Sequence, residues 1–339
     1  LLINRSIRRY SILYHLRYRF NYTPNMGILG INHIAERYYS ETKVVSGAKV
    51  TAAFDLDTPK LNKFCRGKGI ERKESYQAIL DCCDAVFINT PVDQHYSQIM
   101  NALEAGCHVI CNTPIFLTVE EGEACFQKAH EKGLVLFEGI KTLYFPAFEH
   151  LLLLVKSGVI GTVRDIDVSC SQIPENMEQV ETSKYLGSLY DWCTDVMLPI
   201  IKIYESNCSD AQLVDFRKNG FSYFLRGLLH YPNGTASIRA GKGMKVEGEL
   251  IITGTKGYLY VPAPWWRTEY FEVRSEDLRN VKKYFYNYEG EGLRYMIYGF
   301  LHAINHTQSN IRHSRQEIMR STALLEQFHR GHCRVVQMQ

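Results

Sequence analysis

Short apolar runs alternate with amphipathic stretches between residues 26 and 140. The apolar runs predict strands at 26–31, 49–57, 85–89, 108–111 and 134–140. The stretches between them predict helices at 33–42, 59–69, 76–83, 95–106 and 119–133. Strands that alternate with helices predict βαβ units, in which helices cover both faces of a parallel sheet. Because the run AVFIN at 85–89 is almost entirely apolar, it fits a strand buried on both sides.

The pattern changes after about residue 145. An amphipathic helix that ends at Gly158 is followed by strand-like stretches at 162–173, 211–220, 221–234, 235–243, 245–257 and 258–264. Further helices are predicted near 186–204, 292–307 and 313–330. The predicted fold class is therefore an α/β doubly wound parallel sheet followed by an α+β domain with an open, mostly antiparallel sheet.

The length of 339 residues exceeds what one core usually supports, so two domains are expected. We expect residues 23–143 to form the first domain and 144–339 the second. Residues 1–22 are expected to be an extension outside the fold. They belong to a stretch, 1–26, with five Arg and no acidic residue. A transit peptide and an upstream segment read through from a start at Met26 remain as alternatives.

The composition argues against several classes of protein. The net charge is only +3, and no basic run with interleaved aromatic residues occurs after residue 26, so nucleic-acid binding is not expected. No stretch of about 18 apolar residues exists, so no membrane span is expected. The ten cysteines include no CxxC pair, which argues against a metal site and favours reduced thiols in a cytoplasmic protein.

The first predicted strand ends in a loop that is similar to a nucleotide-binding fingerprint. Against G-x-G-x-x-G/A, Gly30 takes the first position, Asn32 the second and Ala35 the third. Asn tolerates a left-handed backbone but adds a side chain where a pyrophosphate approaches, so weakened binding is expected. Asp55 ends the second strand, where an acid bonds ribose hydroxyls, and Asp57 adds negative charge. This favours NAD over NADP; the alternative is that Asp55 caps the following turn.

Several segments resemble the Gfo/Idh/MocA family of sugar and polyol dehydrogenases. They are INTPVDQH at 88–95, LEAGCHVICNTPIFLT at 103–118, the segment 145–166, and GSLYDWCTDV at 187–196. The resemblance extends from about residue 26 to the C-terminus. It implies a Rossmann domain followed by a sheet domain, with the substrate bound between them at the nicotinamide. It also implies that the outer face of the open sheet pairs subunits into a homo-oligomer.

The resemblance implies a set of cofactor-binding residues in the first domain, including the loop that follows the predicted strand at 108–111. This set is Gly30, Asn32, His33, Ile34, Asp55, Thr90, Pro91, His95, Asn112 and Pro114. The catalytic loop of the family carries Glu-Lys-Pro, whereas this chain has Asn112-Thr113-Pro114. Thr113 has neither the charge nor the reach of the family's Lys. Asp191 matches the family's Asp, but Asp195 stands where most members carry His and some carry Tyr.

Other residues could supply the missing chemistry. Asp191 and Asp195 are spaced to share one helix face, where two nearby carboxylates could raise one pKa and create a base. The alternative is that Asp191 caps the helix and Asp195 is solvated. Pro199 lacks an N–H group, so the helix is expected to kink there. Lys141, which follows a strand end, is a further catalytic candidate, with a surface charge as the alternative.

Tyrosine, histidine and tryptophan side chains are further candidates for roles in the site. Tyr144 and Tyr185 are candidates for proton transfer, each with packing as the alternative. His95 is expected to open a helix near the cofactor in a structural role. Trp265, Trp266 and Tyr270 could stack on a sugar ring, although at a sheet edge such residues more often cover a subunit contact.

The sequence leaves three functional hypotheses. The first is an NAD(P)-dependent oxidoreductase acting on a sugar, polyol or related hydroxy compound, and the family resemblance carries it. The second is a non-catalytic nucleotide- or sugar-binding homologue that has lost the catalytic Lys and His. The third is a decayed or truncated product. The partner expected under the first is a small-molecule substrate, and neither nucleic acid nor membrane.

Overall fold

The computed structural model describes residues 20–181, 185–277, 279–287, 290, 292–306 and 311–339. These residues form two compact units. The first contains the described parts of 1–112, 123–141 and 289–312, and the second contains 113–122 and the described parts of 142–288 and 313–339. From the sequence we expected a single boundary between residues 143 and 144. In the structure, residues 113–122 belong to the second unit and the described part of 289–312 belongs to the first.

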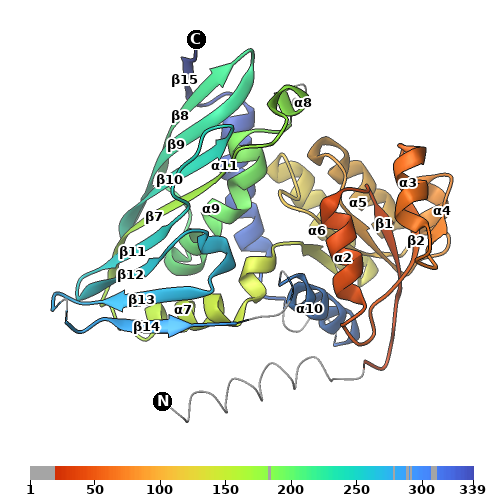
Figure 1. The fold of residues 1–339 in the computed structure, drawn as a ribbon, viewed down its shortest axis with the longest axis horizontal. Helices are drawn as coiled ribbons and strands as arrows, with labels where there is room; N and C mark the ends of the chain where they lie inside the picture. Colours follow the sequence, from red (N-terminus) through yellow and green to blue (C-terminus); the bar gives the residue numbers. More distant parts are fainter. Residues whose placement is uncertain (1–19, 182–184, 278, 288–289, 291, 307–310) are drawn as a thin grey trace. The chain divides into compact units, whose positions relative to one another are not determined.

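The first unit is built on a six-stranded parallel sheet with the strand order β3-β2-β1-β4-β5-β6 (Figure 1). The strands are β1 (Asn25–Leu29), β2 (Lys49–Phe54), β3 (Glu71–Arg72), β4 (Ala85–Ile88), β5 (His108–Cys111) and β6 (Leu136–Glu138). This is the doubly wound order in which the chain direction across the sheet reverses between β1 and β4. The predicted parallel sheet is confirmed, and only the short β3 was not anticipated.

Side-chain caps fix several helix starts in the first unit. The helices are α2 (His33–Thr42), α3 (Thr58–Cys65), α4 (Tyr76–Leu80), η1 (Val92–Gln94), α5 (His95–Glu104), most of α6 (Val119–Lys132) and α10 (Leu293–Asn305). Asn32, Asp57 and Ser75 each accept a backbone N–H from the first turn that follows them. Such caps satisfy N–H groups that have no partner inside the helix. The sequence therefore sets these boundaries locally.

Residues 20–22 lie against helix α10 rather than outside the fold. The ring of Phe20 lies 5.4 Å from that of Tyr298, measured between centroids. The backbone N–H of Tyr22 donates to the side-chain oxygen of Asn305 at 2.9 Å. The expected extension at 1–22 is therefore wrong for its last three residues, and residues 1–19 lie outside the described residues.

The second unit is built on a nine-stranded sheet with the order β14-β13-β12-β11-β7-β10-β9-β8-β15 (Figure 1). The strands are β7 (Val163–Gln172), β8 (Asp210–Lys218), β9 (Phe221–Tyr231), β10 (Gly234–Lys242), β11 (Leu250–Gly254), β12 (Gly257–Val261), β13 (Tyr270–Arg274), β14 (Lys282–Phe285) and β15 (Arg334–Gln337). Only the pairs β7–β10 and β8–β15 are parallel. The predicted mostly antiparallel sheet is confirmed, whereas β13, β14 and β15 were not predicted as strands.

Two long helices, α9 (Ser188–Tyr204) and α11 (Arg315–His329), lie on one face of this sheet (Figure 1). The unit also contains η2 (Lys141–Tyr144, from Thr142 on), α7 (Pro146–Lys156), α8 (Met177–Glu181) and η3 (Trp265–Arg267). Alternate positions of β10, such as Ala236, Ile238 and Ala240, are fully buried beneath the helices. Helix α9 runs through Pro199 to Tyr204. Within the described residues, every helix is too short or too polar to cross a membrane.

Aromatic residues at 258–266, which include two of those considered for a subunit contact, are engaged within the second unit. Trp265 is completely buried and donates its indole N–H to the carbonyl of Ser169 at 3.1 Å. Tyr260 lies beside the guanidinium of Arg274, 4.8 Å from ring centroid to Cζ, and Arg274 also pairs with Glu272. Because these outward positions are occupied by polar pairs, this part of the sheet does not present a simple hydrophobic surface.

Candidate functional site

The loop after β1 turns tightly at Gly30. Its backbone has a φ of +81°, a left-handed conformation that residues with a Cβ rarely adopt. A Cβ at this position would lie 2.5 Å from the carbonyl oxygen of Asn89. The N–H of Gly30 donates to the carbonyl of Phe54 at 3.0 Å, which ties the turn to β2. The first glycine of the predicted fingerprint therefore has the steric role that the motif requires.

Asn32 begins helix α2 and is held by three hydrogen bonds. Its Oδ1 accepts the N–H groups of Ile34 at 2.8 Å and Ala35 at 3.2 Å. The amide of Asn89 donates to the same oxygen at 2.6 Å. With φ −150° and ψ −170°, Asn32 is extended and makes no use of the left-handed conformation considered from the sequence. Its side chain thus occupies N–H groups that point outward from the helix N-terminus.

Asp55 follows β2 and holds two turns together. One carboxylate oxygen accepts the N–H of Ile31 at 2.6 Å, and the other accepts the N–H of Asp57 at 2.8 Å. Lys60 lies 3.8 Å from the first oxygen, and its own N–H is capped by Asp57 at 3.0 Å. The alternative that Asp55 caps the following turn is therefore observed. The carboxylate also reaches the loop of Gly30, as a ribose-binding acid must.

The remaining predicted cofactor residues of the first unit follow β4 and β5. His95 is buried, opens α5 as predicted, and bonds the carbonyl of Thr90 through Nε2 at 2.9 Å. Pro91 precedes the turn η1. Asn112 donates its amide to Asn89 Oδ1 at 3.2 Å. These contacts bring the ends of β4 and β5 to the same edge as the Gly30 loop.

Asn89 is a residue of this edge that the sequence analysis missed. Its amide donates to Asn32 and, at 3.2 Å, to the carbonyl of Gly30, while its carbonyl side accepts from Asn112. It is buried at 5% exposure. The available signal was a polar residue directly after an apolar strand at the carboxyl edge of the sheet. Asn89 therefore links the three strand ends β1, β4 and β5.

The first unit fits a dinucleotide at this edge. The Gly30 turn, the helix N-terminus of His33 and Ile34, and the Asp55 carboxylate lie at the carboxyl ends of neighbouring strands, where the strand order reverses. Asn32 is the one departure, because its oxygen competes with a phosphate for the N–H groups of α2. His33 is exposed and Ile34 half-buried at the start of that helix.

Asp191 lies in the first turn of α9 in the second unit. One carboxylate oxygen accepts the N–H of Gly187 at 2.7 Å, so Asp191 does cap the helix, as the simpler alternative proposed. The other oxygen accepts from the Lys242 ammonium at 3.0 Å. Burial raises the pKa of Asp191, and the charge of Lys242 opposes that rise. The cause of the raised pKa is thus burial and not a second carboxylate.

Lys242 ends strand β10, and the sequence analysis did not identify it. Its side chain is 13% exposed and that of Asp191 is 17% exposed, so the ion pair is largely removed from water. The ammonium also lies 3.4 Å from the side-chain oxygen of Gln172. No local pattern signals this pair, because the two residues are 51 positions apart and meet only where helix α9 packs on strand β10.

Asp195 is half-buried, not fully solvated, one helical turn beyond Asp191. Its carboxylate acts on Cys170: burial, and secondly the charge of Asp195, raise the pKa of that thiol. Asp195 is not among the causes of the raised pKa of Asp191. The coupling of the two carboxylates stays a prediction.

The other catalytic candidates lie in separate places. Thr113 is half-buried in the second unit, next to the buried Pro114. Lys141 is half-buried, is the first residue of η2, and ends the segment 123–141 of the first unit. Tyr144 is buried, and the ring of Tyr185 packs against Tyr190 and His329.

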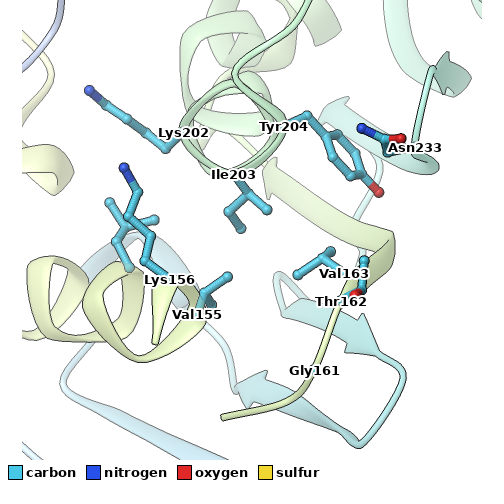
Figure 2. Close-up of a pocket in the computed structure, with 10 residues that line it drawn as sticks. Val155, Lys156, Gly161, Thr162, Val163, Lys202, Ile203, Tyr204 and Asn233 are labelled. Carbon is cyan, nitrogen blue, oxygen red and sulfur yellow. The ribbon is translucent and has the colours of Figure 1, made fainter. Parts of the chain in front are cut away.

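A cavity of about 240 Å³ lies elsewhere in the second unit, between α7, α9 and the start of β7 (Figure 2). Its lining comprises Leu152, Val155, Lys156, Gly161, Thr162, Val163, Lys202, Ile203, Tyr204 and Asn233. Both of its lysines are paired, Lys156 with Glu205 at 2.7 Å and Lys202 with Glu317 at 2.8 Å. None of the predicted site residues lines this cavity.

The described residues contain no group of three or more potential metal-ligating side chains. All ten cysteines are free thiols, as predicted.

Comparison with known proteins points to the same edge of the first unit. A family model, GFO_IDH_MocA, described as an oxidoreductase family with an NAD-binding Rossmann fold, matches residues 24–140. The scyllo-inositol 2-dehydrogenase (NADP(+)) IolU of Bacillus subtilis is 26% identical over 52% of this chain and 54% of its own length. A dTDP-3,4-didehydro-2,6-dideoxy-alpha-D-glucose 3-reductase of Actinomadura kijaniata is 30% identical over 48% of this chain and 50% of its own length.

The trans-1,2-dihydrobenzene-1,2-diol dehydrogenase of Oryctolagus cuniculus is 26% identical over 64% of this chain and 68% of its own. The chain thus spans about half to two thirds of the length of these curated relatives. Among solved structures, a 3-ketoreductase from Actinomadura kijaniata with NADP and TDP-benzene has a TM-score of 0.84 at 20% identity, covering 93% of this chain and 99% of its own. At that identity the likeness establishes the fold of both units.

Proposed function

Because the chain belongs, through residues 24–140, to the Gfo/Idh/MocA oxidoreductase family, we propose that it is an NAD(P)-dependent oxidoreductase of a sugar, polyol or related hydroxy compound. The observation that carries the proposal is the edge of the first unit, where the Gly30 turn, the start of α2 and Asp55 fit a dinucleotide. A non-catalytic homologue gains no support from these relatives, which are named as enzymes.

The proposed cofactor is NAD in preference to NADP. Asp55 places a carboxylate beside the Gly30 loop, where a 2′-phosphate would meet negative charge. Two relatives argue the other way, because IolU is named for NADP(+) and the solved 3-ketoreductase holds NADP. Among the chain's own residues, Gly30, Ile34 and Asp55 would hold the dinucleotide, and Asn32 would weaken its pyrophosphate contact.

The nicotinamide ring supplies or accepts the hydride in such a reaction. The chain's own contribution is to bind the hydroxy compound and to move its proton. We assign this work to Asp191, which burial keeps more basic than an ordinary aspartate. Asp195, Lys141 and Thr113 are the other candidates for this role.

Binding and turnover test the proposal separately. Calorimetry with NAD(H) and NADP(H) should show saturable binding, tighter for NAD(H). A panel of sugars and polyols with the preferred cofactor should then change the absorbance of the reduced nicotinamide. A chain that is folded but binds neither dinucleotide would refute the proposed function.

A homo-oligomer formed through the open sheet is also proposed. Its support is the sheet face opposite α9 and α11, where Leu228 is 39% exposed on β9 and Phe224 lies in ring contact with Phe216. Light scattering at micromolar concentration tests this, and a monomer would contradict it.

A further inference from the structure

The ion pair of Lys242 and Asp191 is costly as a purely structural feature. Both side chains are more than four-fifths buried, and Lys242 follows Ala240 on the face of β10 that packs beneath α9. Burying two opposite charges rarely stabilises a fold more than apolar residues of the same volume. A pair of this kind at the end of a core-facing strand therefore suggests a chemical role.

The ammonium of Lys242 retains donor capacity. It has three N–H groups, and its acceptors among the described residues are Asp191 Oδ1 at 3.0 Å and Gln172 Oε1 at 3.4 Å. Asp191 is itself fixed by the Gly187 N–H, so the pair is held in one arrangement. The ammonium can thus donate one further hydrogen bond to an oxygen atom without leaving its partner.

Two half-buried indoles lie beside the pair. Trp192 follows Asp191 on α9 and donates its indole N–H to the carbonyl of Gly241, the neighbour of Lys242, at 3.0 Å. The ring of Trp266 lies 5.1 Å from that of Trp192. Aromatic surface next to a small number of fixed polar groups is typical of sites that bind small molecules. Because Asp191 neutralises Lys242, the site favours a neutral hydroxy compound over a phosphate.

We propose that Lys242 is a catalytic residue of the oxidoreductase inferred above, which donates a hydrogen bond to the reacting oxygen of a neutral sugar or polyol. The inference rests on the proposed function. It also explains how the chain works with Thr113 in place of the family's Lys: a lysine from the sheet supplies the positive charge.

In the oxidation direction, a bound nicotinamide would accept the hydrogen and electron pair of the substrate C–H bond that breaks. The hydroxyl proton passes to the carboxylate of Asp191, and a C=O bond forms. Lys242 stabilises the negative charge that builds on the oxygen between these two transfers. In the reverse direction, Asp191 returns the proton and Lys242 polarises the carbonyl.

The test compares Lys242→Met and Lys242→Gln with Lys218→Met. Lys218 is an exposed lysine at the end of β8 with no ion pair among the described residues, so its variant removes the same charge without touching the site. Lys242→Gln keeps a hydrogen-bond donor for Asp191. It therefore serves as the second variant if Lys242→Met does not fold. Each variant is measured for turnover on the sugar panel, for NAD(H) affinity, and for quenching of tryptophan fluorescence by the sugar.

We expect both Lys242 variants to lose about 10²–10³-fold in kcat, with NAD(H) affinity and the Lys218 variant unchanged. The acid limb of the rate profile should move to higher pH, because loss of the ammonium raises the pKa of Asp191 further. An ion pair that takes no part in turnover would not move that limb. Turnover of Lys242→Gln equal to that of Lys218→Met at every pH would overturn the inference.

The fluorescence measurement separates this inference from the proposed function. If the wild type binds a sugar without turnover, the oxidoreductase proposal fails, and loss of quenching in Lys242→Gln alone still supports a role in binding the oxygen. If the wild type turns over a substrate and Lys242→Gln does so equally well, only the inference about Lys242 fails. If the wild type neither binds nor turns over any sugar, both fail.

Discussion

The two chemically distinctive regions of this chain use their polar side chains in opposite ways. At the Gly30 loop, the side-chain oxygens of Asn32 and Asp55 accept hydrogen bonds from backbone N–H groups of the same loop, of the start of α2 and of the turn after β2. At the end of β10, Lys242 forms an ion pair with Asp191 of α9. The first arrangement fixes backbone geometry, whereas the second retains an ammonium donor and a carboxylate whose pKa is raised by burial. The first is suited to hold a ligand and the second to move a proton.

The largest expected effect comes from filling the Gly30 turn. Gly30→Ala places a Cβ 2.5 Å from a backbone oxygen in a left-handed conformation, so we expect a loss of about 3 kcal/mol in the free energy of unfolding. Gly67→Ala is the matched control. Gly67 has a φ of +72° with nothing within 4 Å, so only the conformational cost of about 1 kcal/mol should appear.

Urea unfolding followed by far-ultraviolet circular dichroism measures both variants. Equal losses for Gly30→Ala and Gly67→Ala would mean that the loop relaxes around the added methyl group. The tight turn would then be a weaker constraint on the nucleotide edge than its geometry indicates.

The second effect concerns the charge pair itself. A double-mutant cycle of Lys242→Met and Asp191→Asn should give a coupling energy of about 1–3 kcal/mol, because the partners are largely buried. The same cycle on Lys156 and Glu205, which are 61% and 60% exposed, should give about 0–0.5 kcal/mol. A coupling as small as this for the buried pair would contradict the description of the second region.

This coupling should also depend on pH. In Lys242→Met, Asp191 is a buried carboxylate without its cation, so its pKa in the folded state lies further above the unfolded value. A folded-state pKa above the unfolded one favours folding at low pH, and the advantage disappears as the pH rises through that window. The destabilisation caused by Lys242→Met should therefore shrink on acidification, and chemical denaturation across the acidic range measures it.

The difference between the two regions also explains what the sequence could reveal. The β1–α2 loop, with Gly30, Asn32 and Asp55, follows from local rules, because strand periodicity, a left-handed turn and helix capping act within a short segment. The parallel sheet of the first unit follows from the alternation of strands and helices. Asn89 was missed because its role depends on which strand ends become neighbours.

The Lys242–Asp191 pair could not be predicted from the sequence at all. Two residues 51 positions apart meet only if α9 crosses β10 at the right height, and that depends on the packing of the whole sheet. The short strands β13, β14 and β15 were missed likewise. The strands β14 and β15 are the two edges of the sheet and β13 lies next to β14, so each is defined mainly by the strands with which it pairs. The exchange of 113–122 and 289–312 between the units has no local signal either.

The third prediction concerns cofactor choice. Asp55→Asn keeps an oxygen for the Ile31 N–H but removes the charge, so we expect the ratio of NAD to NADP affinity to fall about tenfold, or about 1.4 kcal/mol. Asp57→Asn is the control, because Asn remains a good helix cap and only a charge two residues away is lost. Calorimetry with both cofactors measures the ratio, and an unchanged ratio in Asp55→Asn would remove the argument for NAD.

The smallest effect on stability, and the sharpest test of the nucleotide loop, is Asn32→Gly. Gly caps helices nearly as well as Asn, so the free energy of unfolding should fall by only a few tenths of a kcal/mol, about 0.5 with the lost Asn89 contact. The N–H groups of Ile34 and Ala35 are then available to phosphate oxygens at the positive end of α2. NAD(H) should therefore bind about 3–10-fold more tightly, in line with an added charge-assisted hydrogen bond.

Asn32→Ala separates the effect of releasing the N–H groups of α2 from the effect of removing the side chain beyond Cβ. It frees the same N–H groups but keeps a Cβ and loses about 1 kcal/mol of capping, so its gain in affinity should be smaller than that of Asn32→Gly. If both variants bind NAD(H) more weakly than the wild type, the Asn32 amide must itself contact the dinucleotide. The side chain would then be part of the binding site, and the loop would resemble the Lys242–Asp191 region in retaining a polar group for its ligand.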